Sequence, residues 1–301
     1  MARRLSPAIT LTASAAIVGL ALSACGSSSL STPGTTGATK AAVQKADAAL
    51  VAKLPAKIKA AGKIVVGTDA TYAPNEFLAA DGKTVKGMDV DLFDAVAQKF
   101  GVTVEWQPAK FDSIITGVQG GKYDIGVSSF TVNADRKKQV TMVSYFNAGT
   151  QWATAPGNPK KVDPKDPCGF KVAVQKGTVQ EQVDMPAKVK VCATAGKPVD
   201  LQIYDGQDQA TAAVANGKAD AMLADSPVVA YAIKQSGGKI DAAGAVYDAA
   251  PYGYVLPKAD TEFGKAIIEA LKALDGSGDY KKALSTWGNE AGAISDFAIN
   301  P

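Results

Sequence analysis

The stretch that decides the fold is residues 63–107, which read KIVVGTDATYAPNEFLAADGKTVKGMDVDLFDAVAQKFGVTVEWQ. It begins with a short apolar run at 63–67, which is typical of a strand. Apolar residues then recur at helical spacing over 89–100, and Gly101 is a typical helix stop. A second strand-like run follows at 103–107. This order of strand, helix and strand predicts parallel strands in an α/β architecture.

The same alternation continues along the chain in two blocks. The first block adds a predicted helix at 111–119 and a predicted strand at 123–127, and it stops at the Pro- and Gly-containing segment 155–159. The second block contains predicted strands at 171–174, 201–204 and 219–223 and predicted helices at 178–184, 207–216 and 226–235. Two amphipathic helical patterns, 260–275 and 279–287, follow without a strand between them. Two α/β blocks of this length predict two lobes.

Composition excludes several classes of protein. The chain has 301 residues, of which 47% are hydrophobic and 20% charged, so a disordered or collagen-like chain is excluded. The formal net charge is only +3, which predicts no bulk attraction to nucleic acid. Histidine is absent, which excludes His-based catalytic triads and His metal sites. We therefore expect neither a metal nor a cofactor.

The N-terminal segment has the features of an export signal. Arg3 and Arg4 precede the uncharged stretch 8–21, which is shorter than a membrane-spanning helix needs. The segment ends in Leu-Ser-Ala-Cys at 22–25, which resembles the bacterial lipobox, and the resemblance implies cleavage before Cys25 and lipidation of its sulfur. An ordinary signal peptide or an uncleaved anchor are the alternatives. We expect a lipoprotein signal peptide at 1–24, a flexible Gly/Ser/Thr-rich tether at 25–40 and an N-terminal helix at 41–62 that Pro55 interrupts.

The same interpretation assigns a role to each of the three cysteines. If Cys25 carries lipid, Cys168 and Cys192 remain, and an exported pair is expected to form a disulfide. Two buried free thiols are the alternative. Zinc is not expected, because the chain has no histidine and no Cys-x-x-Cys motif.

Five segments together resemble the extracellular solute-binding proteins of ABC importers, in the family that captures polar amino acids. They are residues 66–74, 87–91, 111–115, 128–136 and 176–178, and the resemblance spans about 63–287. It implies a two-lobe α/β fold of the type II periplasmic-binding-protein class, in which two hinge strands join the lobes around a ligand cleft. The expected hinges lie near 150–155 and 250–256. The expected boundaries are 63–151 for the first part of lobe one, 152–252 for lobe two and 253–301 for the C-terminal return to lobe one.

A free amino acid carries a carboxylate and an ammonium, and burying either charge without a partner is costly. Arg136 is the candidate for the carboxylate because a guanidinium can bind it bidentately, although Arg136 could also be a solvated turn residue. Asp225 is the candidate for the ammonium, although it could instead cap the following helix. The resemblance places both residues at the family's ligand-binding positions. Residues 133–135 read Asn-Ala-Asp where the family usually has Thr-x-Glu, but Asn133 can still cap the short helix.

The resemblance implies further contacts with the ligand. The backbone N–H of Thr131 would assist Arg136, and the carbonyl of Ser129 would be a second acceptor for the ammonium. Tyr72 and Phe111 would enclose the stem of the ligand's side chain. The alternatives are a core position for Phe111 and a surface turn position for Tyr72.

Lobe two would contribute the start of a helix and a residue that contacts the ligand's side chain. Thr178 and Val179 open a predicted helix whose N–H groups favour an anion, unless they form a plain strand-to-helix turn. Asp69 and Gln175 match positions that contact the ligand's side chain, and an acidic Asp69 favours a cationic or amide side chain. Asp69 could instead only brace its own loop. Ser128 completes the predicted set of ligand-binding residues.

These features predict a monomeric extracellular lipoprotein without catalytic chemistry, anchored by its lipid to the outer face of the cytoplasmic membrane. It would capture a polar amino acid and deliver it to the permease subunits of an ABC importer. One alternative is an exported enzyme on the same fold, of the cyclohexadienyl or arogenate dehydratase type. Such an enzyme needs an acid in the cleft, for which Glu76 and Glu181 are the candidates. The other alternative is a ligand-sensing lipoprotein, which would usually carry its own transmembrane and signalling segments.

Overall fold

The computed structural model describes residues 43–301. The predicted signal peptide, Cys25 and the predicted tether lie outside the described residues. Within the described part of the chain, no helix is long and apolar enough to cross a membrane.

The strands are β1 (Lys63–Thr68), β2 (Thr71–Tyr72), β3 (Glu76–Leu78), β4 (Val85–Lys86), β5 (Thr103–Pro108), β6 (Ile125–Gly126), β7 (Thr141–Thr154), β8 (Lys171–Gln175), β9 (Asp200–Tyr204), β10 (Ala221–Asp225) and β11 (Asp241–Leu256). The α-helices are α1 (Ala48–Ala52), α2 (Ala56–Ala61), α3 (Met88–Lys99), α4 (Phe111–Gln119), α5 (Ala134–Gln139), α6 (Met185–Thr194), α7 (Gln207–Ala215), α8 (Ser226–Gln235), α9 (Thr261–Ser277) and α10 (Asp279–Thr286). A π-helix, η1 (Gln180–Asp184), precedes α6, and a 3-10 helix, η2 (Glu290–Gly292), follows α10. The expected α/β class is confirmed.

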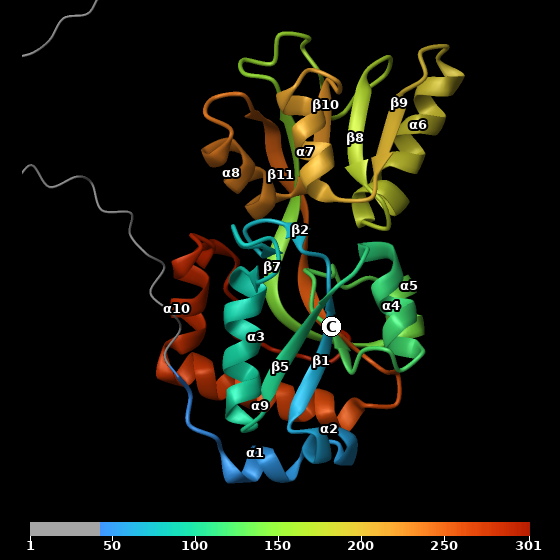
Figure 1. Cartoon of the computed structure of the whole chain (residues 1–301). Coiled ribbons are helices and arrows are strands. Elements are labelled where there is room, and N and C mark those ends of the chain that lie inside the picture. The colour runs from blue at the N-terminus through green and yellow to red at the C-terminus, as the bar shows by residue number, and fades with distance from the viewer. Residues whose placement is uncertain (1–42) are drawn as a thin grey trace, which may run out of the picture. The chain divides into compact units, whose positions relative to one another are not determined.

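Eight strands hydrogen-bond in the order β5-β1-β6-β11-β7-β10-β8-β9. The outer strands pair in parallel on both sides, β1 with β5 and β6, and β8 with β9 and β10. The central strands β7 and β11 pair antiparallel from Thr141–Leu256 at one end to Thr154–Asp241 at the other. They are 14 and 16 residues long, whereas strands usually have about 3–10 residues. These two strands therefore run through both halves of the fold and connect them (Figure 1).

Each half has its own cores, and we call the halves the first lobe (β1, β5, β6) and the second lobe (β8, β9, β10). In the second lobe, neighbouring residues alternate between two cores: Val172 and Leu223 pack on one face, and Ala173 and Met222 on the other. This alternation follows from the two-residue period of a strand and is typical of a parallel sheet covered by helices on both faces.

The C-terminal helices belong to the core of the first lobe. Leu271 of α9 and Leu284 of α10 lie in the same cluster as Leu92 and Phe93 of α3. After the last crossing through β11, the chain thus returns to the lobe in which it began (Figure 1).

Two local features follow from particular residues. In the described part of the segment 41–62 the structure has two short helices, because Pro55 is the N-cap of α2 and Gly62 ends that helix in the left-handed conformation. Cys168 and Cys192 form the expected disulfide, with a Cα–Cα distance of 4.9 Å, and it ties the segment before β8 to α6.

Candidate functional site

The candidate site lies where the ends of strands from both lobes meet. Asp225 is the last residue of β10 in the second lobe, and Arg136 lies in α5, which follows β6 of the first lobe. This placement agrees with the rule that open α/β sheets bind ligands at the carboxyl ends of their strands. Nine residues line one small pocket there: Tyr72, Phe111, Ser129, Thr131, Arg136, Thr178, Val179, Gln180 and Asp225. Eight of the nine are predicted from the sequence, and Gln180 is not.

The pocket is almost closed in this conformation. Its volume is about 10 Å³, and a cavity needs roughly 10–15 Å³ to hold one water molecule. An amino acid does not fit, so ligand entry requires the two lobes to move apart about β7 and β11.

Arg136 is a buried residue, with 7% of its surface exposed, so it is not a solvated turn residue. Its backbone N–H donates to the side chain of Asn133, which caps α5 as expected. The guanidinium donates to the carbonyl of Thr131 at 2.8 Å and to that of Gly177 in the second lobe at 3.0 Å. Its central carbon also lies 5.4 Å from the ring centre of Phe111. Burial lowers the pKa of Arg136 to about 10, so the group remains charged at neutral pH.

Asp225 is buried and does not use its side chain to cap α8. One carboxylate oxygen, Oδ2, accepts from the hydroxyls of Tyr72 at 2.8 Å and Tyr252 at 2.7 Å. The other, Oδ1, accepts from the side-chain amide of Gln180 at 2.7 Å. Burial raises the pKa of Asp225, and these three hydrogen bonds and the charge of Arg136 oppose that rise.

The two predicted aromatic residues, Tyr72 and Phe111, have different environments. Tyr72 lines the pocket and reaches the second lobe through its hydroxyl group, so it is not a surface turn residue. Phe111 lines the pocket and also stacks on Phe130 with ring centres 4.5 Å apart. Phe111 therefore combines the cleft position with the core position that the sequence left open.

Thr178 and Val179 line the pocket at the start of the π-helix η1. The Thr178 hydroxyl donates to the carbonyl of Gln175 at 2.7 Å and thereby closes the turn after β8. The helix predicted at 178–184 begins as this π-helix at Gln180, and continues as α6.

Three predicted residues, Asp69, Ser128 and Gln175, lie next to the lining residues without being among them. The side-chain amide of Gln175 donates to Asp69 Oδ2 across the lobes, while Asp69 Oδ1 accepts from the backbone and hydroxyl of Thr71. Asp69 therefore braces its loop as well as facing the second lobe. Burial raises the pKa of Asp69 to about 6, and among the described residues Gln175 Oε1 is buried without a hydrogen-bond partner. This corner of the site contains acceptors in excess of donors.

Two ion pairs cross between the lobes at the surface. Lys110 lies 2.7 Å from Asp205, and Lys176 lies 2.8 Å from Asp112. Each lobe contributes one cation and one carboxylate, so the pairs are complementary. Exposed ion pairs contribute little stability and are screened by salt, so these contacts orient the lobes more than they hold them together.

The sequence profile of the bacterial extracellular solute-binding proteins, family 3, matches residues 64–290. The chain belongs to this family. Among its relatives, the arginine-binding protein ArgT of Corynebacterium glutamicum is 35% identical over 250 residues, which cover 83% of this chain and 82% of ArgT. The resemblance noted in the five sequence segments is thereby confirmed.

Solved structures of the family support the same assignment. An ancestral arginine-binding protein bound to glutamine has a TM-score of 0.68 and 34% identity, and the match covers 76% of this chain and 99% of that one. An ancestral amino-acid-binding protein described as a precursor of cyclohexadienyl dehydratase has a TM-score of 0.68 and 32% identity, and the match covers 77% of this chain and 97% of that one. These family members are named as binding proteins of amino acids.

The two candidate acids for a dehydratase do not line the pocket. Glu76 is fully buried and accepts hydrogen bonds from the hydroxyls of Ser128 and Ser129. Glu181 accepts from the backbone N–H of Gly177 at 3.1 Å. Both carboxyl groups are thus engaged in holding the loops of the site.

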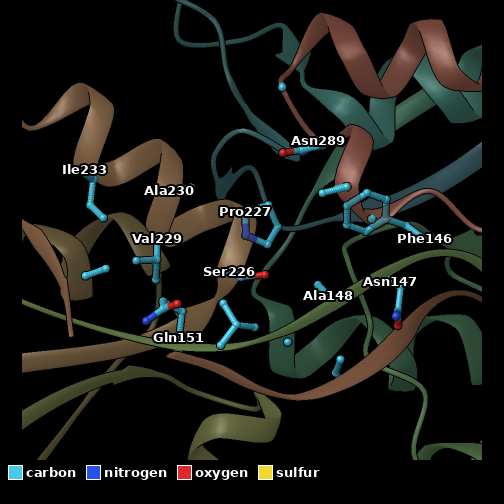
Figure 2. Close-up of a pocket in the computed structure, with 17 residues that line it drawn as sticks. Phe146, Asn147, Ala148, Gln151, Ser226, Pro227, Val229, Ala230, Ile233 and Asn289 are labelled. Carbon is cyan, nitrogen blue, oxygen red and sulfur yellow. The ribbon is translucent and has the colours of Figure 1, made fainter. Parts of the chain in front are cut away.

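A separate cavity of about 450 Å³ lies behind the hinge strands. Figure 2 shows Pro227 and Val229 of α8 on one side of this cavity and Asn289, which follows α10, on another. Gln151 of β7 lines it, whereas the side chain of the preceding residue, Thr150, meets Gln180 at the pocket.

The sequence does not single out Gln180 and Tyr252, which both bind Asp225. Gln180 directly follows the predicted pair Thr178 and Val179, and Tyr252 lies in the predicted hinge 250–256. The signal that the sequence offers for Tyr252 is a polar hydroxyl group in a predicted hinge strand. This signal is weak, because a tyrosine at this position is equally compatible with the core.

Proposed function

We propose that this protein captures an amino acid between its lobes, with Arg136 binding the α-carboxylate and Asp225 the α-ammonium. The observation that carries the proposal is that these two opposite charges reach one closed pocket from opposite lobes. A zwitterionic ligand satisfies both charges only when the lobes are together, so its binding favours the closed state over the open one. Tyr72 and Phe111 would flank the ligand between these two ends.

We further propose that the ligand's side chain is cationic, as in arginine. Asp69 provides a buried carboxylate, and Gln175 provides a buried carbonyl oxygen that lacks a donor. A guanidinium or ammonium group supplies donors to both, whereas an acidic side chain would meet only acceptors. The relatives named as arginine-binding proteins support this class of ligand.

We propose delivery of the amino acid to the permease of an ABC importer by a monomeric, membrane-anchored protein. The family assignment supports the extracellular site of capture. The Leu-Ser-Ala-Cys sequence at 22–25 supports lipidation at Cys25, and the Gly/Ser/Thr-rich residues 26–37 suit a spacer between lipid and lobes.

Calorimetric titration tests the capture step. Arginine should bind with micromolar affinity or better, about −8 kcal/mol or more favourable, and glutamate should bind much more weakly. Agmatine, which is arginine without its carboxylate, and 5-guanidinopentanoate, which is arginine without its α-ammonium, should both fail to bind. Tight binding of either analogue would contradict the roles of Arg136 and Asp225, and preferred binding of glutamate would contradict the role of Asp69.

Membrane fractionation tests the anchor. The full-length chain expressed in a bacterium with lipoprotein processing should be found with the membrane, and mass spectrometry should find a diacyl-modified Cys25 at its N-terminus. Cys25→Ala should prevent this modification. An N-terminus upstream of Cys25 in the mature protein would contradict the proposed anchor.

A further inference from the structure

Two carboxyl groups lie against the pocket residue Ser129, and neither forms an ion pair within the part of the chain that the structure describes. Glu76, at the start of β3, and Asp89, in α3, are both fully buried, and a carboxyl oxygen of each lies 3.2 Å from the same hydroxyl group, that of Ser129. The other titratable groups that act on this pair are Asp69, Tyr72, Tyr145 and Tyr254. None of these groups carries a positive charge. Within residues 43–301, neither Glu76 nor Asp89 forms an ion pair.

The surroundings of the pair favour one proton between the two groups. Two ionised carboxylates packed against one hydroxyl group in a buried site would repel each other, and a single proton removes that repulsion. Asp89 Oδ2 accepts from the N–H of Ser129 at 2.9 Å and from the hydroxyl of Tyr145 at 2.6 Å, which suits an ionised group. Within residues 43–301, Asp89 Oδ1 is buried without a hydrogen-bond partner, so it is free to accept a carboxyl proton.

The electrostatics agree with this assignment. Burial is the largest cause that raises the pKa of each group, and hydrogen bonds from Tyr145 and Ser129 oppose the rise at Asp89, whose pKa is raised to about 6. The charge of Asp89 adds to the effect of burial at Glu76, whose pKa is raised well above its usual value. These directions favour the proton on Glu76 and the negative charge on Asp89.

The pair is attached to the most constrained residue of the pocket. Ser129 lines the pocket and has a φ of 50°, in the left-handed region that non-glycine residues seldom adopt. Its N–H is held by Asp89, and its hydroxyl lies 3.2 Å from Glu76 and from Asp89 and accepts from Asn75 at 2.9 Å. Ser128, the residue before it, donates to Glu76 at 2.9 Å.

We propose that Glu76 and Asp89 share one proton and act together as positioning residues that fix Ser129 against the ligand pocket. The part of this inference that concerns ligand affinity rests on the proposed function. Loss of the shared proton would place two negative charges side by side without a cation, and the loop that carries Ser128 and Ser129 would lose its support. Affinity and stability should therefore both fall as the pair becomes doubly ionised.

The sign of the pH effect follows from linkage. A carboxyl group whose pKa is raised on folding binds its proton more tightly in the folded state than in the unfolded state. Its contribution is fully present below the unfolded-state pKa and is lost as the pH rises through the folded-state pKa. As the pH rises above the usual range of a glutamate toward the raised folded-state pKa of Glu76, the wild-type protein should lose thermal stability relative to Glu76→Gln, which has no proton to lose.

Three variants test the proposal. Glu76→Gln keeps the shape and a hydrogen-bond donor toward Asp89, whereas Glu76→Ala removes both. Asp91→Asn is the matched control, because Asp91 is an acid of the same helix that binds Trp287 and does not touch Ser129. We expect Glu76→Ala to weaken arginine binding about 5- to 100-fold and Glu76→Gln to restore it to within about threefold of wild type.

Infrared spectroscopy observes the proton itself. At neutral pH the wild-type protein should show the carbonyl stretch of a protonated carboxyl group that is missing from Glu76→Gln and retained in Asp91→Asn. The infrared band and the pH dependence of thermal unfolding need no ligand, so they judge the shared proton even if no amino acid binds. Failure of arginine to bind the wild type would overturn the proposed ligand alone.

Two results would overturn the proposal. One is the absence of an infrared difference between wild type and Glu76→Gln together with parallel pH profiles of stability. The other is equal arginine affinity in Glu76→Ala and wild type, which would show that Ser129 does not depend on the pair. If Glu76→Ala does not fold, the infrared and pH comparison of wild type with Glu76→Gln still decides.

Discussion

Gly177 offers a direct test of lobe closure. It has a φ of 80° at the turn after β8, and it lies against α4 of the other lobe. A Cβ atom at this position would lie 2.9 Å from the Cβ of Asp112 and 3.0 Å from its Cα. The first distance is shorter than real Cβ contacts show and the second is at that limit, so the lobes of Gly177→Ala must shift from the closed arrangement seen here.

The substitution has two effects that act on different equilibria. The left-handed φ costs an alanine about 1–2 kcal/mol in the open and the closed protein alike. The overlap with Asp112 exists only in the closed protein, and overpacking of this kind typically costs about 1–3 kcal/mol. Since about 1.4 kcal/mol corresponds to a tenfold change in affinity, Gly177→Ala should weaken arginine binding about 5- to 150-fold.

Gly196→Ala is the matched control. Gly196 belongs to the same lobe and has a φ of 72°, but no atom lies within 4 Å of a Cβ at that position. Both variants should lose a similar amount of thermal stability, whereas only Gly177→Ala should lose affinity in calorimetric titrations with arginine. Equal dissociation constants for the two variants would refute the idea that ligand affinity depends on this closed contact.

Three further predictions concern the charges and the disulfide. Arg136→Lys and Asp225→Asn should each weaken arginine binding by two orders of magnitude or more, as titration would show, because loss of one partner of a buried charge pair costs about 3–5 kcal/mol; a change below tenfold would contradict the assigned role. Arginine affinity should fall as the pH decreases through about 6, where Asp69 becomes protonated and loses its charge, and Asp69→Asn should show no such decrease in the same titrations. Replacing both Cys168 and Cys192 by Ser should lower the free energy of unfolding by about 3 kcal/mol for a bridge spanning 24 residues, and a denaturation midpoint that neither the replacement nor reductant changes would contradict this.

The sequence predicts those parts of the fold and site that depend on short-range pattern. Periodicity locates β1 and α3 to within one residue at each end, because the residues that form each pattern lie close together in the sequence. Arg136 and Asp225 are predicted because the resemblance to the family places them at ligand-binding positions, whereas the residues alone are equally compatible with a solvated turn and a helix cap. The pairing of Asp69 with Gln175 is not visible, because it joins residues that are 106 positions apart in different lobes.

The shared-proton pair is hidden for the same physical reason. Glu76 and Asp89 each look like an exposed acid next to a turn or at a helix start, and only the packing of β3 against α3 removes both from water. The π-helix at Gln180 is also unpredicted, since it needs tertiary contacts, such as the bond from Gln180 to Asp225, to hold its wider turn. The elements that the sequence analysis does not predict, such as this π-helix and most of the long strands β7 and β11, are thus ones that long-range contacts hold in place.

The contacts inside the closed pocket explain why both ends of a ligand should matter. Without a ligand, Arg136 donates to two backbone carbonyls, and Asp225 accepts from two tyrosines and one amide. A ligand carboxylate can replace the carbonyls with charge-assisted bonds, which are stronger, and an ammonium can do the same for the hydroxyls at Asp225. A ligand that lacks one end must open the lobes and break the existing bonds at that end without replacing them. The protein's own contacts thus compete with the ligand, and only a complete amino acid replaces all of them. The loss of binding free energy for agmatine and 5-guanidinopentanoate should therefore exceed that of one ordinary hydrogen bond, about 0.5–1.5 kcal/mol.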